Sequence, residues 1–280
     1  MKILALADLH NYKPWFQWVK LNPQDLTLIA GDMLDGLAEK GLPSQVLFTK
    51  AWFDSFQKPL GVCSGNHDSN TGGLHDDPSA VDLLLPEEKT FLSSIMYDSK
   101  WKRRNNWMDC LEKKNTVTDI RTEVLTVNSE KIVITTLPYL FHDQSDPYSI
   151  KLWKEGKRKK EEFGCPWIVL HHDPAYGTSG DGALYGNNIL HQKLIENKPD
   201  FLFSGHLHSQ PYGGCFADKV GVTWCLNPGH PHDEMFGETE LPITPNHIFV
   251  DTEEMTAVWN ASFFLNGKWT RNSETIDLSV

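Results

Sequence analysis

Five short segments rich in aspartate, asparagine and histidine recur along this chain, and each follows a short apolar run. In chain order they are Asp8-Leu9-His10, Gly31-Asp32, Gly65-Asn66-His67-Asp68, His171 and Gly205-His206-Leu207-His208. They offer oxygen and imidazole nitrogen donors without a thiolate, which suits divalent metal ions. Because the segments run from residue 8 to residue 208, a single site built from all of them requires most of the chain to fold as one unit.

The apolar runs themselves predict buried strands that end at Gly or Asp. Such runs cover residues 3–7, 26–30, 60–64, 167–170, 201–204, 222–226, 247–251 and 255–260. A hairpin is expected from residues 123–127 and 131–137, and Asn266-Gly267 predicts a second one within 263–270. Helices are expected at residues 44–58, 147–163 and 187–197; in the first of these, Phe48, Trp52 and Phe56 recur every four residues.

Strands and helices alternate in the first half of the chain, and hairpins are more frequent in the second half. This pattern predicts an α/β fold with two mixed sheets and helices outside them. In open α/β sheets, ligands bind beyond the carboxyl ends of strands, which is where all five segments sit. We expect one domain over residues 1–280, with an acidic loop at 70–86 and a helical insertion at about 87–114.

Composition restricts the functional class. The formal net charge of −11 is unfavourable for sequence-independent binding to duplex nucleic acid, which depends on Lys and Arg. The five cysteines include no CxxC pair, so reduced thiols are expected rather than a disulfide framework. The apolar run at residues 3–7 is too short for a signal peptide or a membrane span. We therefore expect a soluble cytoplasmic protein with no membrane partner; the sequence does not specify its oligomeric state.

The donor set favours a pair of ions over a single one. A carboxylate can bridge two ions, and Asp32 is placed to do so. Asp8 and His10 alternate at a strand end and are expected to face one ion. Two ions about 3.5–4 Å apart clamp phosphoryl oxygens and activate a water molecule. His67 is then expected to protonate the leaving group, with Asp68 holding its other ring nitrogen.

The order DxH, GD, GNHD, a lone His and GHxH resembles the calcineurin-like metallophosphoesterase superfamily over roughly the first three-quarters of the chain. The resemblance implies the metallophosphatase fold of that family, a four-layer α/β/β/α sandwich. It also implies a dinuclear metal-dependent phosphoesterase that hydrolyses phosphodiester or phosphomonoester bonds. The attacking group would be a metal-bridging hydroxide acting in line with the leaving group.

The resemblance also implies a role for each matching residue. The first ion would be held by Asp8, His10, Asp32 and His208. The second would be held by Asp32, Asn66, His171 and His206. His67 would be the leaving-group acid. The family uses Mn, Fe, Zn or related ions, and the donor set does not choose among them.

Some assignments stay open. His171 and His172 compete for the place of the lone histidine, with His142 beyond another strand; we favour His171, which directly follows the strand at 167–170. Asn11, His172, His230 and His232 are then candidates for substrate contacts at the rim of the site.

The substrate is expected to be a phosphoester, with nucleotides and nucleic acids included. A metal-dependent DNA or RNA nuclease is the main alternative, because residues 100–107 and 151–160 mix basic and aromatic side chains. A catalytically silent scaffold is less favoured, since no ligand is missing. A protein Ser/Thr phosphatase is disfavoured, because the five segments lack the additional Gly, Glu and Arg residues that are found in protein Ser/Thr phosphatases of the superfamily.

Overall fold

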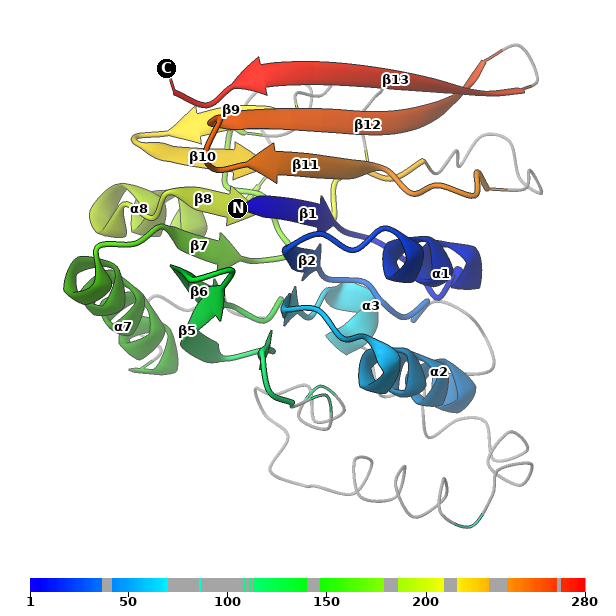
Figure 1. Ribbon diagram of the computed structural model, residues 1–280, viewed down its shortest axis with the longest axis horizontal. Coiled ribbons are helices and arrows are strands. Elements are labelled where there is room, and N and C mark those ends of the chain that lie inside the picture. Colours follow the sequence, from blue (N-terminus) through cyan, green and yellow to red (C-terminus); the bar gives the residue numbers. More distant parts are fainter. Residues whose placement is uncertain are drawn as a thin grey trace.

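Two β-sheets pack face to face in this computed structural model, and helices cover their outer sides (Figure 1). The structure describes residues 1–36, 42–69, 86, 108, 111, 113–139, 147–178, 186–208, 216–231, 241–265 and 268–279. Within these residues the order of layers is helix, sheet, sheet, helix. The fold is therefore the four-layer α/β/β/α sandwich that the sequence predicts.

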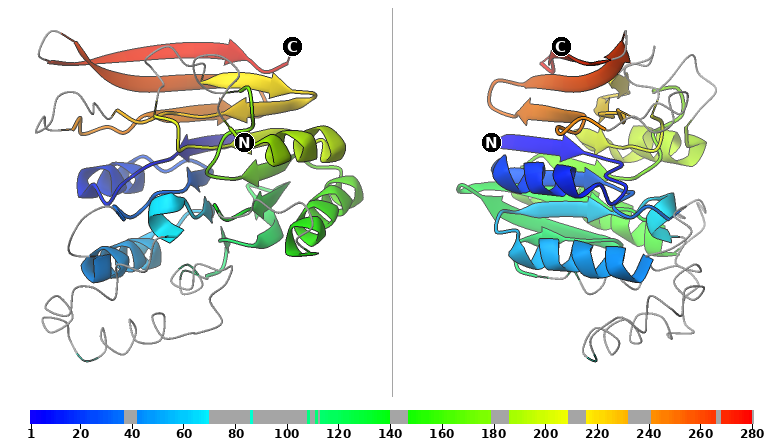
Figure 2. Two further views of the ribbon diagram at one scale, coloured as in Figure 1. Left: turned by 180° about the vertical axis from the view of Figure 1, so that it is seen from behind. Right: turned by 90° about the vertical axis from the view of Figure 1, so that its right-hand side faces the viewer.

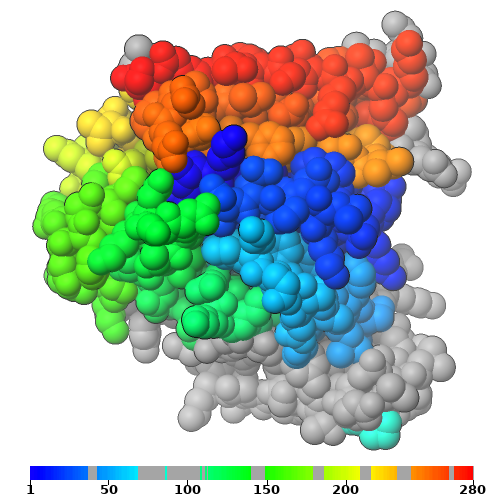
Figure 3. All heavy atoms as spheres, in the orientation of Figure 1, coloured from blue at the N-terminus to red at the C-terminus, as the bar shows by residue number. Residues whose placement is uncertain are grey.

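The first sheet, as far as the structure describes the chain, has seven strands in the order β13-β12-β11-β1-β2-β3-β4. Their bounds are Lys2–Leu6 (β1), Leu26–Ala30 (β2), Leu60–Cys63 (β3), Thr116–Val117 (β4), His247–Asp251 (β11), Thr256–Leu265 (β12) and Lys268–Asp277 (β13). Strands β1 to β4 are parallel, whereas β11, β12 and β13 join them in antiparallel pairs. Figure 3 shows β12 and β13 as an orange and red band along one edge of the molecule.

The second sheet has six strands among the described residues, in the order β5-β6-β7-β8-β10-β9. Their bounds are Arg121–Val127 (β5), Glu130–Thr136 (β6), Trp167–Leu170 (β7), Phe201–Phe203 (β8), Ala217–Val220 (β9) and Thr223–Leu226 (β10). Strands β6, β7, β8 and β10 are parallel, and β5 and β9 form antiparallel edges. Each sheet therefore has a parallel centre whose strands all end on one side.

Three apolar clusters hold the four layers together. The first lies between the sheets and includes Ile3, Leu28, Ile134 and Leu170, all with no exposed surface. Helices α1 (Lys13–Leu21) and α2 (Leu42–Ser55) cover the first sheet through the second cluster. Helices α7 (Pro147–Phe163) and α8 (Asn188–Asn197) cover the second sheet through the third cluster, and so lie on the opposite side of the molecule (Figure 2). Burial of both faces explains why the central strands are continuous apolar runs rather than alternating ones.

Most predicted elements appear at or within a few residues of the expected positions. The strands at 26–30, 167–170 and 247–251 and the helix at 147–163 have the predicted bounds. Strands β11 and β12 pair across residues 252–254, and Leu265 pairs with Lys268 across the predicted Asn266-Gly267 turn, which itself lies outside the described residues. Helix α1 and strand β9 were not predicted. Strand β9 carries Asp218 and Lys219 on a solvent-facing edge, so it lacks an apolar run.

Several expectations fall outside the described residues. They include the acidic loop at 70–86 apart from Pro86, and nearly all of the insertion at 87–114. Of that insertion, Met108 and Leu111 are buried in the cluster that joins α1 and α2 to the first sheet. The single-domain assignment stays a prediction. Among the described helices, none is both long and apolar enough to cross a membrane.

The buried histidine of β11 makes stability depend on pH. His247 is 1% exposed and packs against the rings of Trp18 and Phe249, and its Nδ1 donates to the carbonyl oxygen of Pro245 at 2.9 Å. Burial lowers the pKa of His247 to about 4. An ordinary histidine of the unfolded chain has a pKa of about 6.5. The unfolded state therefore binds a proton that the folded state does not bind.

We predict that the free energy of unfolding falls as the pH is lowered from about 6.5 to about 4, with a contribution from His247 on the order of 3 kcal/mol. His247→Asn keeps a donor near Pro245 without the titrating ring, so this contribution should disappear. Urea unfolding at pH 7.5 and 5.0, with a chelator present, measures how the free energy of unfolding changes with pH in the wild-type protein and in the variant. Equal pH dependence in the two proteins would contradict the prediction.

Candidate metal centre

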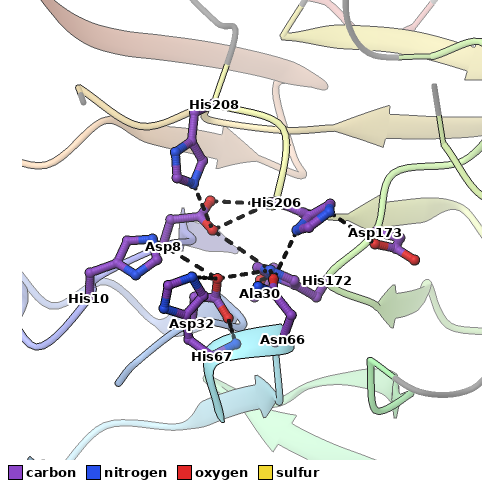
Figure 4. Close-up of polar contacts among 12 residues, drawn as sticks. Asp8, His10, Ala30, Asp32, Asn66, His67, His172, Asp173, His206 and His208 are labelled. Atoms are coloured by element: carbon purple, nitrogen blue, oxygen red, sulfur yellow. Dashed lines mark hydrogen bonds and ion pairs between the residues drawn. The ribbon is translucent and has the colours of Figure 1, made fainter. Parts of the chain in front are cut away.

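The polar segments gather where five parallel strands end (Figure 4). Strands β1, β2 and β3 of the first sheet lead to Asp8, Asp32 and Asn66, and β7 and β8 of the second lead to His172 and His206. The side chains therefore converge from both sheets. The short helix α3 (Asn66–Ser69) begins at the centre itself.

The backbone at this centre is strained. Asp8, His10, Asp32 and His206 have φ angles of 56°, 42°, 50° and 66°, in the left-handed region that non-glycine residues rarely adopt. Strain of this kind costs about 1–3 kcal/mol per residue and collects at functional sites. It also corrects one expectation: β1 ends at Leu6, so Asp8 and His10 approach each other through a turn and not by alternation along a strand.

Two carboxylates form the middle of the cluster. Asp8 is fully buried and Asp32 is 1% exposed. Nε2 of His208 lies 3.5 Å from Oδ1 of Asp8, and Nε2 of His10 lies 4.0 Å from Oδ2 of Asp32. Burial alone would raise the pKa values of both carboxyl groups, but the surrounding imidazoles outweigh it and lower them. Both aspartates are therefore ionised and need positive charge beside them.

The structure brings His172, and not the favoured His171, to these carboxylates. Nε2 of His172 lies 3.2 Å from Oδ2 of Asp32 and 3.8 Å from Oδ1 of Asp8. His172 has no exposed surface, so the prediction that it lies at the rim is wrong. His171 is also buried, and its Nδ1 donates to the carbonyl oxygen of Asp173 at 3.1 Å. Two consecutive histidines after a strand give no sequence signal that decides which ring faces the site.

The hydrogen bonds of His172 test whether a cation fits here. Its Nδ1 donates to the carbonyl oxygen of Ala30 at 2.7 Å, so the neutral ring has a lone pair at Nε2. That lone pair faces Oδ2 of Asp32 and, at 3.0 Å, Oδ1 of Asn66. Three acceptors converge, and only a proton or a metal ion can lie between them. Burial lowers the pKa of His172, but Asp32 and Asp8 raise it overall to about 10. A proton on Nε2 is therefore one way to place positive charge between these acceptors.

Further donors complete two neighbouring groups. His206 Nδ1 lies 2.9 Å from Oδ1 of Asn66, on the side of His172. Asp8, His10 and His208 bring one donor atom each within 4.8 Å of one another, as do Asp8, Asp32 and His172. Nε2 of His10 is buried without a hydrogen-bond partner among the described residues. Oxygen and nitrogen donors, buried negative charge and an unsatisfied imidazole nitrogen all suit a divalent cation.

His67 lies at the open side of the carboxylates, 12% exposed, with Nε2 at 3.9 Å from Oδ2 of Asp32. Its Nδ1 lies 3.1 Å from the backbone nitrogen of Gly36, whose N–H it accepts when the ring is neutral, and 3.7 Å from Oδ1 of Asp35, which it faces when the ring is protonated. Burial lowers the pKa of His67, but Asp35 and Asp32 outweigh this effect and raise it. The neighbouring carboxylate on the Nδ1 side is thus Asp35, which the sequence analysis missed although it lies three residues after Asp32.

Asp68 does not have the predicted set of contacts. It is fully buried, and its carboxylate accepts hydrogen bonds from the backbone N–H groups of Met33, Leu34 and Gly65. Burial, followed by the charge of Asp32, raises the pKa of Asp68 to about 7. Asp68 therefore joins the Gly31-Asp32 and Gly65-Asn66 loops, and the expectation that it orients the ring of His67 stays a prediction.

The candidates for substrate contacts have different positions. His230 is 2% exposed and lies behind the centre, stacked on His208 and edge-on to His10 and Trp15. It therefore packs against two of the candidate ligands and does not reach the rim. Asn11 is partly exposed and follows His10 directly. His232 and His142 lie outside the described residues.

Glycines allow the loops to come this close together. A Cβ atom at Gly65 would lie 2.1 Å from Oδ1 of Asp32 and 2.5 Å from its backbone nitrogen. A Cβ atom at Gly205 would lie 2.7 Å from Oδ2 of Asp8. A Cβ atom at Gly31 would lie 2.3 Å from Nδ1 of His172. The glycines of the second, third and fifth segments are therefore required by close contact and not only by turn conformation.

We predict that Gly65→Ala displaces Asp32, lowers stability by about 1–3 kcal/mol and weakens metal binding. Gly164→Ala is the matched control: a Cβ atom at Gly164 would meet open space, but its φ is 58°, so alanine there should cost about 1–2 kcal/mol without affecting metal binding. Thermal unfolding and titration with Mn²⁺ separate the two effects. Equal metal affinities for both variants would count against the close-contact explanation.

Comparisons with solved structures agree with this fold. Protein TT1561 of Thermus thermophilus is similar in structure, with a TM-score of 0.54, 13% identity and coverage of 99% of this chain and 98% of that one. A dimetal phosphatase from Danio rerio (LOC 393393) has a TM-score of 0.52, 12% identity and coverage of 100% and 99%. At such low identity these likenesses show the fold alone. No curated protein sequence matches the chain.

The family model of calcineurin-like phosphoesterases matches residues 1–210, which is 210 of the 280 residues and includes all five polar segments. The chain therefore belongs to the calcineurin-like phosphoesterase family.

Proposed function

We propose that this protein is a dinuclear metal-dependent phosphoesterase that hydrolyses phosphodiester or phosphomonoester bonds. The observation that carries the proposal is the convergence of two buried, ionised aspartates with four imidazoles and one amide oxygen at the strand ends. Family membership supports a hydrolase, and the similar structure from Danio rerio is described as a dimetal phosphatase.

The free thiols of Cys63, Cys165 and Cys225 support a reducing compartment, so we also propose that the protein acts in the cytoplasm.

The positions of the donors divide them between two ions. Asp8, His10, Asp32 and His208 are the proposed ligands of the first. Asp32, Asn66, His172 and His206 are the proposed ligands of the second, with His172 replacing His171. Asp32 is shared, because its Oδ2 faces His10 on one side and His172 on the other. Mn, Fe and Zn all suit this donor set.

When bound, such a pair polarises a phosphoryl oxygen and lowers the pKa of a coordinated water molecule. The chain's own residues contribute orientation and proton transfer. The carbonyl oxygen of Ala30 fixes the tautomer of His172 that leaves Nε2 bare. Asp68 holds the two loops that carry Asp32 and Asn66, so the donors keep their spacing before a substrate arrives.

His67 is the proposed general acid for the leaving group. It stands beside Asp32 on the partly exposed side, and Asp35 and Asp32 favour its protonated form. A general acid must carry a proton at the working pH, and a raised pKa serves that purpose. In this proposal the proton moves from His67 to the departing alkoxide, while Asp35 stabilises the charged ring.

The proposed activity can be tested with Mn²⁺-loaded protein on a panel of nitrophenyl monoesters and diesters, cyclic nucleotides, nucleoside polyphosphates and DNA. We expect Mn²⁺-stimulated hydrolysis of at least one class, and loss of it after chelation. Protein that binds two ions per chain but hydrolyses none of these esters would favour a scaffold over an enzyme.

His172→Ala and His171→Ala form a direct test of the ligand assignment. We predict that His172→Ala removes the second ion and lowers turnover by more than about 100-fold, because a ligand should matter more than an outer partner. His171→Ala should keep two ions per chain. Metal analysis of both purified variants decides; loss of an ion only in His171→Ala would make His171 the ligand instead.

His67→Ala should lower kcat by about 10²–10⁴-fold on esters with poor alkoxide leaving groups. The loss should be much smaller on nitrophenyl esters, since nitrophenolate leaves without protonation. Metal content should stay at the wild-type value. The same loss on both kinds of ester would mean that His67 acts on something other than the leaving group.

One observation favours a nuclease as the second candidate. Helix α7 exposes Lys151, Lys154, Lys157 and Arg158 in an otherwise acidic protein. The helix connects β6 to its parallel neighbour β7, so in the chain it follows the carboxyl end of β6, and β7 leads to His172 at the centre. A nucleic-acid strand whose phosphates contact these basic side chains would bind less tightly as the salt concentration increases.

We predict that replacing Lys151 and Lys154 by Gln reduces single-stranded DNA binding and flattens its salt dependence, if nucleic acid is the substrate. Hydrolysis of a small nitrophenyl diester should not change. Fluorescence anisotropy at 50 and 200 mM salt provides the measurement. Strand binding that is absent at 50 mM salt in the wild-type protein would remove the nuclease from consideration.

A further inference from the structure

Asp173 lies directly after the two histidines that follow β7, and its contacts link it to two imidazoles. Its carbonyl oxygen accepts a hydrogen bond from Nδ1 of His171 at 3.1 Å. Its carboxylate Oδ1 lies 3.9 Å from Nε2 of His206, and the side chain is 14% exposed (Figure 4). The carboxylate thus stands behind His206, on the side of the ring opposite the candidate centre.

The two nitrogens of His206 face different groups. Nδ1 lies 2.9 Å from Oδ1 of Asn66, so Nδ1 is the atom that points into the centre. Nε2 points outward to Asp173. A neutral imidazole carries one proton, and only the nitrogen without it can bind a metal ion. His206 can therefore use Nδ1 as a ligand only when the proton is on Nε2.

Two acceptors compete for that proton. Without a metal ion, the amide oxygen of Asn66 can accept it from Nδ1. The carboxylate of Asp173 can accept it from Nε2, and a charged acceptor makes the stronger hydrogen bond. Outer carboxylates of this kind fix the tautomer and the orientation of histidine ligands. At 3.9 Å the contact has ion-pair distance and is longer than a hydrogen bond.

We propose that Asp173 is a positioning residue that holds the Nε2 proton of His206 and so makes Nδ1 available to the second metal ion. The proposal rests on the dinuclear centre proposed above and deepens it. Asp173 itself does not touch the ion. Its effect should be specific: removal of the carboxylate weakens the second ion and leaves the first, which His10 and His208 hold, largely unchanged.

The alternative is that Asp173 only shapes the turn before Pro174. A purely structural role would lower the stability of the whole protein, or weaken both ions together. The ratio of the two metal affinities therefore separates the explanations, and it can be measured without any substrate. Asp218 provides the matched control, because it is an exposed aspartate on the edge strand β9 whose carboxylate accepts from the backbone N–H of Lys219.

The experiment uses metal-free full-length protein in four forms: wild type, Asp173→Ala, Asp173→Asn and Asp218→Ala. Mn²⁺ titration by calorimetry gives both affinities, and electron paramagnetic resonance reports the exchange-coupled Mn pair. We expect about 10–100-fold weaker binding of the second ion in Asp173→Ala. The resonance signal of the exchange-coupled Mn pair should then be lost when Mn²⁺ exceeds the two sites by one equivalent. Asp173→Asn should lie between this variant and wild type, because its amide oxygen is a neutral acceptor. Asp218→Ala should match wild type.

The outcomes distinguish the proposals. If Asp173→Ala binds the second ion within about threefold of wild type, or weakens both ions equally, the role assigned to Asp173 is overturned while the dinuclear centre stands. Should Asp173→Ala fail to fold, the same criterion applies to Asp173→Asn, which keeps the shape of the side chain. Wild-type protein that never binds two ions overturns the dinuclear centre and the role of Asp173 together.

Discussion

The close approach of two buried carboxylates, Asp8 and Asp32, is the constraint on which the rest of this centre depends. Two ionised groups without access to water are costly unless positive charge lies beside them. Around them the chain places three imidazoles: His10 and His208 on one side, and His172 on the other. The left-handed backbone at both aspartates adds a further cost. A fold keeps such an arrangement only where the surrounding layers enforce it.

The two parallel sheet centres supply that enforcement. Strands β1 and β2 are neighbours in the first sheet, and β7 and β8 are neighbours in the second, so their carboxyl ends deliver side chains to one region between the sheets. The loops are then joined to each other by hydrogen bonds: Asp8 N to Gly31 O, His10 N to Asp32 O, and Gly205 N to His172 O. A further contact joins the two sheets through the side chain of Asp8, which accepts from the backbone N–H of His206. The centre is thus a structural junction as well as a chemical site.

Sequence periodicity predicted the layers well because each central strand is buried on both faces and reads as an apolar run. It missed α1, whose apolar residues Trp15, Phe16 and Val19 give only one helical repeat after Pro14. The types and order of the residues located the segments of the centre, but they do not indicate in which direction each side chain points. Hence His171 was favoured although the ring of His172 is the one that faces the carboxylates, His230 was placed at the rim although it is buried, and Asp35 was overlooked beside Asp32. All three depend on three-dimensional packing that no local pattern records.

Protonation of the imidazoles explains how these side chains tolerate one another. Asp32 and Asp8 raise the pKa of His172 to about 10, so a protonated Nε2 can supply positive charge to Asp32 and Asn66. His10 is different: burial lowers its pKa to about 4, so it stays neutral with a lone pair ready for coordination. A divalent ion brings twice the charge of the proton it replaces and also satisfies Nε2 of His10, which has no hydrogen-bond partner among the described residues. The same electrostatic demand therefore favours ions of higher charge, and binding of such ions would release protons.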